Sequence, residues 1–438
     1  MNRTVEKNKT LLVDGPASVT LVTGKAEAFG ATITTAGKVV IREGKRLPFL
    51  VLETATFDIS HGENALIEEV EGDTVPQSWI KSFEELASLS AKPIVVLVLG
   101  AVDSGKTSLC TYLTNRALTK KWKVAVLDGD LGQADIGPPS TIAYAFVTKS
   151  VTDLFSLRTR NAFFVGDTSP IRVKDKVIEG LCLLKKELLT GNPDIVVVNT
   201  DGWTEGECAV DYKVSLAKAV EPDLVLCLQQ KDELTFMCNA LADFKKTLVE
   251  SPLAVFQRNI EKRRSLRELG YVKYLRNAKV QSLSLGWVKV EGNELFDLCK
   301  ARLSMKQANR IYSLLGMKPL HVAEFSDRIC VVIGRRRWIE GDNIKKVEEF
   351  TKKKVVVTRK GEEEGLFAGL FNAGRKFLGV GVLQEIDYLR KSMKVCTPVS
   401  DEISTLVLGN VRLDKNMKEI STGAEENSVD FSSFNRLF

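Results

Sequence analysis

The sequence has little of what several common kinds of functional site require. It has only two histidines, His61 and His321, in 438 residues, which disfavours chemistry built on histidine. Its eight cysteines include no C-x-x-C pair, which argues against a zinc site and a disulfide framework. No apolar run reaches the roughly 18 residues of a membrane span, and the opening MNRTVEKNKT lacks the apolar core of a signal peptide. We therefore expect a soluble intracellular protein with no membrane partner.

What remains is the composition of a globular chain that is long enough for two or three domains. Hydrophobic residues make up 44% of the chain and charged residues 27%. The formal net charge is +6, which mildly favours an acidic partner such as nucleic acid without establishing one.

Three regions differ in their hydrophobic patterning. In residues 1–90, short β-rich runs such as LLVDGPASVTLVTG are broken by glycine turns and predict a small antiparallel sandwich or barrel. In residues 91–305, continuous apolar runs such as PIVVLVLG alternate with amphipathic segments such as KVIEGLCLLKKELL. That alternation predicts a doubly wound parallel α/β sheet. Residues 306–438 return to strand-like runs with glycine turns and predict a second β-rich domain.

The segment GAVDSGKT (100–107) matches the phosphate-binding motif G-x-x-x-x-G-K-[ST] at every defined position. It follows a predicted strand and opens a predicted helix, which is the context that the motif requires. Lys106 is expected to reach the β- and γ-phosphates, and Thr107 to hold Mg²⁺. The fold class is therefore α/β, a central P-loop sheet flanked by N-terminal and C-terminal β-rich domains. The predicted nucleotide-binding residues are Gly100, Asp103, Ser104, Gly105, Lys106, Thr107 and Ser108.

Acidic residues follow the next predicted strand, in LDGDLGQADIGPP. Asp128 and Asp130 sit at the carboxyl end of a parallel strand, where α/β sheets bind ligands. Because they alternate with Gly129, both side chains are expected on the same side of the strand. One carboxylate would orient Mg²⁺ and the other would accept a proton. We assign Asp128 with Thr107 to the metal and Asp130 to proton transfer.

Two other classes of P-loop protein fit the sequence less well. A GTPase switch needs an N-K-x-D base-recognition motif after a later strand, and Gln230-Lys231-Asp232 matches it poorly. A partner-switch ATPase of the ParA type has an additional lysine early in the loop, where this chain has Ala101. A kinase acting on a small molecule or a polynucleotide remains, and it needs a base near the acceptor and an arginine lid.

The segment RNIEKRRSLR (258–267) supplies candidates for that lid. Arg263 and Arg267 are four residues apart, so they share one face of a helix. Two guanidinium groups on one face can bind phosphate oxygens bidentately and stabilise charge in a phosphoryl transition state. The alternative is an ordinary basic, solvated helix. The place of the segment after the core strands raises the lid interpretation to the level of that alternative and leaves both open.

Together these segments resemble the polynucleotide 5′-hydroxyl kinases of the Clp/Grc type, which phosphorylate RNA 5′ ends. LVTGKAEAFGATIT near the start and LGVGVLQEIDYL with TLVLGNVRLD near the end resemble the family's flanking β domains. The resemblance therefore covers nearly the whole chain, and its specificity comes from the order of the segments. The core segments are GAVDSGKT, LDGDLGQ, GDTSP (166–170), NTDGW (199–203) with Gly206, and the arginine segment (258–267).

The resemblance implies a role for each matching residue. Lys106, Asp130, Arg263 and Arg267 form the expected catalytic set, with ATP and Mg²⁺ as cofactors. Trp203 is expected to stack on the terminal base, since every base offers a π-face to an aromatic ring. The expected RNA-binding residues are Gln133, Thr168, Ser169 and Trp203.

The function predicted from the sequence is ATP-dependent transfer of the γ-phosphate to the 5′-hydroxyl of RNA, with DNA as a second acceptor, in RNA processing. Protein partners from RNA processing are also expected. The alternative is an ATP-bound scaffold subunit of an RNA-processing complex with little kinase activity. We expect a cytoplasmic, archaeal-type protein, or a nuclear one if the chain is eukaryotic.

Overall fold

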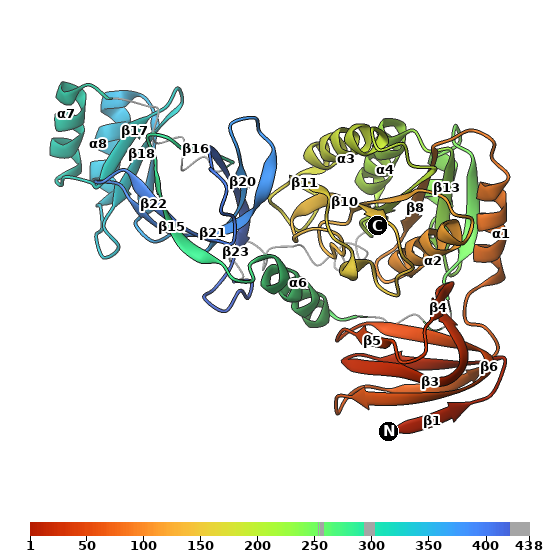
Figure 1. Ribbon diagram of the computed structural model, residues 1–438. Helices are drawn as coiled ribbons and strands as arrows, with labels where there is room; N and C mark the ends of the chain where they lie inside the picture. Colours follow the sequence, from red (N-terminus) through yellow and green to blue (C-terminus); the bar gives the residue numbers. More distant parts are fainter. Residues whose placement is uncertain (253, 255–257, 293–302, 421–438) are drawn as a thin grey trace, which may run out of the picture. The chain divides into compact units, whose positions relative to one another are not determined.

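The computed structural model of the chain describes residues 1–252, 254, 258–292 and 303–420 (Figure 1). The chain divides into two compact units, Met1–Gly270 and Tyr271–Phe438, and each is described by itself. Within the described ranges, none of the helices has both the length and the apolar character needed to cross a membrane.

The first unit begins with a seven-stranded antiparallel β-sheet. The long strands β3 and β6 form its centre, and side chains from alternating positions fill a core that includes Phe49 and Phe57. This agrees with the β-rich domain predicted from the sequence. Its strands are β1 (Asn2–Val5), β2 (Lys9–Asp14), β3 (Ala17–Ala28), β4 (Ala31–Ile33), β5 (Lys38–Ile41), β6 (Arg46–His61) and β7 (Ile67–Glu71).

A second seven-stranded sheet follows in the same unit, in the order β11-β10-β9-β12-β8-β13-β14. Strands β9, β12, β8, β13 and β14 run parallel, as the continuous apolar runs predict. The strands are β8 (Ile94–Gly100), β9 (Val124–Gly129), β10 (Thr141–Val147), β11 (Asn161–Phe164), β12 (Ile195–Thr200), β13 (Leu224–Gln229) and β14 (Lys246–Glu250).

Strands β10 and β11 are antiparallel to their neighbours, which departs from the wholly parallel sheet that we predicted. No helix lies between β9 and β10 or among the residues that join β10 to β11, apart from one 3₁₀ turn, Leu154–Ser156. A parallel neighbour needs a longer crossover, usually through an α-helix, so these short connections return the chain antiparallel.

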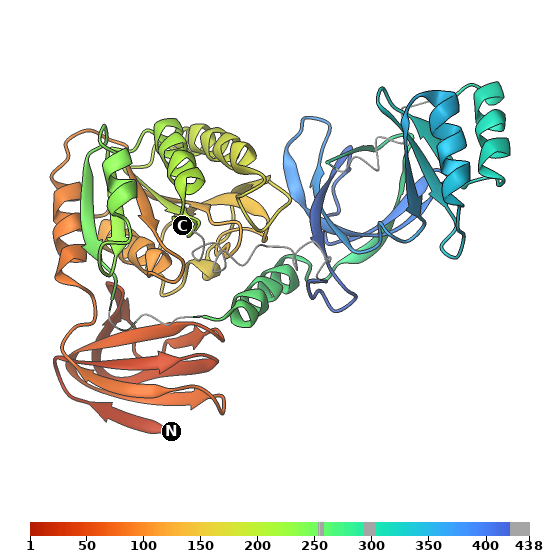
Figure 2. The same cartoon turned by 180° about the vertical axis from the view of Figure 1, so that it is seen from behind.

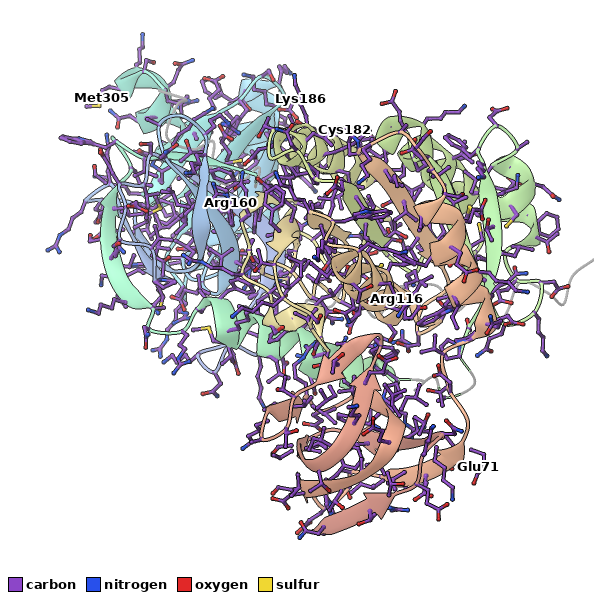
Figure 3. All side chains as sticks on the ribbon, turned by 45° about the vertical axis from the view of Figure 1, so that its right-hand side comes forward. Glu71, Arg116, Arg160, Cys182, Lys186 and Met305 are labelled. Carbon is purple, nitrogen blue, oxygen red and sulfur yellow. The ribbon has the colours of Figure 1, made fainter. Side chains whose placement is uncertain are left out.

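Helices cover both faces of this sheet, as Figure 2 shows from behind. On one face, α3 (Lys174–Leu189), α4 (Glu207–Val220) and α5 (Thr235–Ala240) bury a large core cluster against the strands. The other face packs against α2 (Lys106–Thr119), and α1 (Gln77–Ala87) packs against β14 and α2. Figure 3 labels Arg116 on α2, where the helix meets the N-terminal sheet. The packing there is close, because a Cβ added at Gly30 would lie 3.0 Å from the Cδ of Arg116.

Ion pairs join the N-terminal sheet to the P-loop sheet within this unit. Arg42 donates two hydrogen bonds to Asp153, of 2.7 and 2.9 Å, and one of 2.6 Å to Asp135. Lys45 lies 3.2 Å from the same Asp135 carboxylate. These charges are partly or wholly buried, so the pairs fix the N-terminal sheet beside the phosphate-binding loop.

Helix α6 (Ile260–Tyr274) contains the boundary between the units, and the second unit holds two further sheets. A six-stranded sheet has the order β15-β22-β21-β20-β23-β16, and a three-stranded sheet, β17-β18-β19, carries two helices. Its elements are β15 (Lys279–Ser284), β16 (Lys289–Glu291), α7 (Met305–Leu315), β17 (His321–Glu324), β18 (Arg328–Ile333), α8 (Gly341–Thr351), β19 (Lys354–Arg359), β20 (Leu366–Phe371), β21 (Phe377–Asp387), β22 (Ser392–Thr397) and β23 (Thr405–Arg412).

The C-terminal sheet therefore starts earlier than the boundary that we predicted at residue 305. Strands β15 and β16 lie within the region 91–305 assigned to the kinase domain, yet they pair with β22 and β23. The reason is that pairing partners more than 100 residues away complete this sheet, and the local pattern around 279–291 does not indicate them.

Candidate active site

A cavity of about 660 Å³ opens where the parallel strands β8, β9 and β12 end. In doubly wound sheets ligands bind at the carboxyl ends of the strands, so this is the expected place for a site. The cavity is lined by the phosphate-binding loop, the loops after β9 and β12, the segment 168–171, α6 and part of the N-terminal sheet. It thus brings together every region of the first unit to which the sequence assigned a role.

The phosphate-binding loop has the geometry that its motif predicts. A Cβ at Gly100 would lie 2.7 Å from the Leu228 carbonyl oxygen, so only glycine fits there. Gly105 adopts a φ of 102° directly before α2, a conformation that favours glycine. Gly105 and the first residues of α2 line the cavity, and a helix N-terminus at a cavity is an arrangement that binds phosphate.

Lys106 is the buried cation of this loop, with only 6% of its surface exposed. Its Nζ donates a hydrogen bond of 2.7 Å to the carbonyl of Ala101 in the same loop. Burial lowers the pKa of Lys106 to about 8, and the nearby Asp130 carboxylate opposes that shift. The ammonium is thus held at the cavity in a setting that a phosphate group would stabilise.

Not every hydroxyl of the loop faces the cavity. The buried Ser104 hydroxyl lies beside Gly100, where an added Cβ would be 2.7 Å from its Oγ, and Ser104 does not line the cavity. The side chains of Thr107 and Ser108 line the same cavity. Of the predicted nucleotide-binding residues, Asp103, Gly105, Lys106, Thr107 and Ser108 line the cavity, whereas Gly100 and Ser104 do not.

Asp130 lies just beyond the end of β9 and faces the cavity. Its Oδ1 accepts hydrogen bonds from the backbone N–H groups of Gly132, at 3.0 Å, and Gln133, at 2.9 Å. Burial raises the pKa of Asp130, while the Lys106 ammonium acts in the opposite direction. A carboxylate held by its own loop, with a raised pKa and a cavity in front of it, is suited to accept a proton.

Asp128 occupies a different environment from the one that we predicted. Its carboxylate, 1% exposed, accepts hydrogen bonds from the backbone N–H groups of Asp130, Asp135 and Ile136 and from Asn199 Nδ2. Burial, with two neighbouring carboxylates, raises its pKa to about 7. Asp128 does not line the cavity and its oxygens are occupied by these donors, which disfavours its predicted role as a direct metal ligand. Through these four hydrogen bonds Asp128 fixes the conformation of the loop that carries Asp130.

The arginine segment begins at the phosphate-binding loop. Asp103, predicted to contact nucleotide, lines the cavity and accepts hydrogen bonds of 3.0 Å from the N–H and the Nη1 of Arg258. Arg263 Nη2 lies 3.4 Å from the same carboxylate, and the Arg263 Nε is buried without a partner. Arg258 Nε also donates to the Gly44 carbonyl of the N-terminal domain, at 2.7 Å. Arg263 and Arg267 both line the cavity, as the lid assignment requires.

The residues predicted to hold RNA also line the cavity. Thr168, Ser169 and Trp203 line it together with Gln133. The Ser169 N–H donates to Asp167, which shapes the turn, and Gln133 Nε2 donates to the carbonyl of Arg263 at 3.1 Å. Gln133 therefore also links the loop after β9 to the arginine helix.

Sequence reasoning missed an acidic residue at the cavity and its two partners. Asp201 lines the cavity and is 4% exposed, and both Tyr212 and Lys213 on α4 contact its carboxylate. The NTDGW segment contained the signal, because Asp201 precedes Gly202 and Trp203. Lys213 sits in an amphipathic helix, and nothing in the local pattern distinguishes it from a solvated lysine.

Among the described residues, no group of three or more histidines, cysteines, aspartates or glutamates is arranged to hold a metal ion by itself. A Mg²⁺ ion commonly binds through one or two protein oxygens plus water and substrate phosphates. Thr107 and Asp130, both at the cavity, offer such oxygens.

The fold and the loop define a P-loop nucleotide-binding protein with an arginine segment beside its cavity. A family model described as the P-loop of the mRNA cleavage and polyadenylation factor CLP1 matches residues 100–277. The polyribonucleotide 5′-hydroxyl-kinases of Pyrococcus abyssi and Pyrococcus furiosus are 30% and 31% identical to the chain. Each match covers 79% of this chain and 95% of the relative. The chain belongs to this Clp1-type family of polyribonucleotide 5′-hydroxyl-kinases.

A solved structure of Clp1p in complex with Pcf11p has the same fold, with a TM-score of 0.65 at 13% identity. The match covers 94% of this chain and 97% of that one. The predicted architecture, a P-loop sheet flanked by β-rich parts, is thereby confirmed.

Proposed function

We propose that the protein transfers the γ-phosphate of ATP to the 5′-hydroxyl of RNA. The observation that carries this proposal is the set of groups that meet in the one cavity at the carboxyl edge of the P-loop sheet. Lys106, Asp130 and Arg263 line it from three different elements, and Trp203 lines it from a fourth. A cation, a base and a lid arginine are the parts that phosphoryl transfer to an alcohol needs. The archaeal kinases to which the chain is similar carry that activity in their names.

In the proposed reaction the Asp130 carboxylate accepts the proton of the 5′-hydroxyl as the hydroxyl oxygen attacks the γ-phosphorus. The bond from the γ-phosphorus to the β–γ bridging oxygen breaks, and ADP leaves with that electron pair. Arg263 and Arg267 offset the negative charge that spreads over the transferring group. Lys106 leaves the Ala101 carbonyl and pairs with the β- and γ-phosphates. Mg²⁺, when bound, would supply further positive charge at these phosphates. Thr107, whose hydroxyl lines the cavity, would hold it, and the Asp130 carboxylate would stay available to accept the proton.

The N-terminal sheet contributes the far end of the cavity, where we place the adenosine. Phe29, Leu12 and Pro48 line that region together with the buried Trp79. The rings of Phe29 and Trp79 lie 6.5 Å apart between centroids. An apolar, aromatic wall suits a purine base, whereas the phosphate end is lined by charged groups.

On the acceptor side, Thr168 and Ser169 offer a hydroxyl-bearing turn of the kind that contacts backbone phosphates. Trp203 offers a ring that stacks on a base whatever its identity, so binding through this contact does not depend on the RNA sequence. These contacts do not distinguish RNA from DNA, and we propose RNA as the main acceptor and DNA as a second one.

We also propose that the protein works with RNA-processing partners. A fold relative was solved as a complex of Clp1p with Pcf11p, and the family model describes a cleavage and polyadenylation factor.

The match spans 92–95% of the first three archaeal relatives but 59–67% of the Clp1 relatives from three animals. This supports the archaeal-type, cytoplasmic setting over the nuclear one.

A label-transfer assay tests the proposed activity. The protein is incubated with γ-labelled ATP, Mg²⁺ and a 5′-hydroxyl RNA oligonucleotide, beside matched DNA and 5′-phosphorylated RNA. We expect label on the 5′-hydroxyl RNA, none on the phosphorylated RNA, and none with Lys106→Ala or Asp130→Asn. Folded protein that binds ATP but labels no acceptor would favour the scaffold alternative instead.

A further inference from the structure

A buried ion pair lies beside the Trp203 segment and takes no part in the phosphoryl transfer proposed above. Lys213, on α4, is 0% exposed. Its Nζ lies 2.9 Å from Asp201 Oδ2 and donates to the Asp201 carbonyl, also at 2.9 Å. The Tyr212 hydroxyl donates to the same Oδ2 at 2.9 Å. Burying a charged pair carries a desolvation cost that an apolar pair of similar size avoids, so the arrangement calls for a role besides stability.

The same carboxylate reaches Trp203 through its other oxygen. The backbone N–H of Trp203 donates to Asp201 Oδ1 at 3.0 Å. The indole of Trp203 stacks on the ring of Tyr212, with centroids 5.6 Å apart and planes 26° apart. Both the backbone and the ring of Trp203 are therefore fixed by groups from this cluster, and one face of the indole is covered while the residue still lines the cavity.

The negative charge of Asp201 is also compensated within this cluster. Asp201 lines a cavity that is built to accept phosphates, where an uncompensated carboxylate would repel them. Lys213 compensates that charge from the side of the protein core, and the three donors to Asp201 satisfy its oxygens. The cluster is thus electrically neutral toward the cavity and geometrically fixed.

We propose that Asp201, Tyr212 and Lys213 are positioning residues for the acceptor. They hold the indole of Trp203 so that its uncovered face stacks on the 5′-terminal base of the RNA. The chain then has a continuous stack of Tyr212, Trp203 and the acceptor base. This inference rests on the proposed kinase function.

The test removes the stacking partner from the substrate as well as from the protein. Two 5′-hydroxyl RNA oligonucleotides are compared, one intact and one with an abasic first nucleotide. In the wild type, loss of the base should lower kcat/KM by about 5- to 150-fold, the range expected for one stacked base. In Tyr212→Leu the difference in kcat/KM between the two RNAs should largely disappear. Without Tyr212 the Trp203 indole is no longer oriented, so even the intact RNA cannot stack its base there.

A matched control separates positioning from general loss of stability. Tyr144 is also a buried tyrosine with its hydroxyl on a carboxylate, that of Glu187, and it does not line the cavity. Tyr144→Leu should lose comparable thermal stability and keep the full abasic penalty. A Tyr212→Leu protein that keeps the full penalty would overturn the proposal.

A second pair of variants tests the charge balance. Lys213→Met leaves Asp201 facing the cavity without its cation and should raise the KM for RNA. Adding Asp201→Asn should restore that KM, because the double variant carries neither charge and is expected to fold even where Lys213→Met alone does not. If the folded double variant shows the same increase in the KM for RNA as Lys213→Met, the charge of Asp201 is not what impairs RNA binding. A wild type that labels neither RNA would refute the kinase function, and with it this inference.

Discussion

Asp103, in the phosphate-binding loop, is hydrogen-bonded to Arg258 at the start of the arginine segment. The backbone N–H and the Nη1 of Arg258 each donate to one oxygen of the carboxylate, both at 3.0 Å. The Arg258 carbonyl in turn accepts a hydrogen bond of 2.8 Å from Arg263 Nη2. The loop that binds the nucleotide and the helix that carries the lid arginines are therefore joined through one acidic side chain, 7% exposed.

The first prediction concerns this contact. Asp103→Asn should lower kcat by about 10- to 100-fold, because a buried charge-assisted hydrogen bond is worth about 1.5–3 kcal/mol and here positions the lid. The KM for ATP should change less than kcat, since both oxygens of Asp103 already accept hydrogen bonds from Arg258. Steady-state kinetics with varied ATP would measure both. Arg264→Ala is the control, as Arg264 pairs with Glu268 within the helix and does not line the cavity. Similar losses in kcat for both variants would contradict the anchoring role.

The second prediction follows from Lys106. Burial lowers its pKa to about 8 from the usual 10.5, so at about pH 8.5 the ligand-free side chain is mostly neutral. Bound phosphates favour the ammonium and raise the pKa again, so nucleotide binding should take up a large fraction of one proton. Calorimetry in two buffers of different ionisation enthalpy would measure the uptake. Lys106→Met should show none, and an equal uptake by this variant would assign the proton to another group.

The lowered pKa of Lys106 also determines whether the free energy of unfolding rises or falls with pH. Between about pH 8 and 10.5 the unfolded chain binds the Lys106 proton more strongly than the folded protein does. Lys106 therefore makes the free energy of unfolding rise with pH through that window, and it opposes folding below it. Urea denaturation of the wild type and of Lys106→Met should give curves that converge as the pH increases. Parallel curves would show that the lysine titrates normally in the folded protein.

The third prediction concerns Asp130. Asp130→Asn should reduce kcat by about 100- to 10,000-fold, the range that general-base catalysis contributes. Because burial raises the pKa of Asp130, the wild-type kcat/KM should rise with pH over a range above that of an exposed carboxyl group. Glu205→Gln serves as the control, since Glu205 is an exposed carboxylate at the same cavity. A pH profile that is unchanged in Asp130→Asn would place the base elsewhere.

The fourth prediction separates Asp128 from Asp130. In Asp128→Asn an amide NH₂ would face N–H donors, so the free energy of unfolding should fall by about 1–3 kcal/mol. The dependence of kcat on Mg²⁺ concentration should stay close to that of the wild type in the folded fraction. The opposite pattern, intact stability with a weakened response to Mg²⁺, would restore the metal role that the sequence suggested.

The fifth prediction tests the adenosine end of the cavity. Phe29→Ala should raise the KM for ATP about five- to tenfold, as expected for loss of one aromatic contact. The KM for RNA should be unaffected. Leu52→Ala, at a partly exposed position in the same sheet, should leave both values unchanged. An effect of Phe29→Ala on RNA alone would mean that the base of the acceptor, and not that of ATP, occupies this end.

The sequence alone determined the phosphate-binding loop and the order of the segments around it. Gly100, Gly105 and Lys106 are constrained by local geometry, since a loop that wraps phosphate before a helix needs those residues at that spacing. The parallel strands were predictable for a similar reason, because a strand buried on both faces is apolar throughout. Helical spacing placed Arg263 and Arg267 on one face of a helix, but their place at the cavity was predicted only from the position of the segment and from the family resemblance.

Only the tertiary structure decided what each acidic side chain does. Asp128 and Asp130 look alike in sequence, yet β9 ends between them, and Asn199 from the neighbouring strand reaches only Asp128. Asp103 meets Arg258 and Asp201 meets Lys213 through contacts between separate elements. The role of a charge depends on its burial and on the donors around it, and those come from parts of the chain that are distant in sequence. That is why local patterns located the site but not the network that holds it.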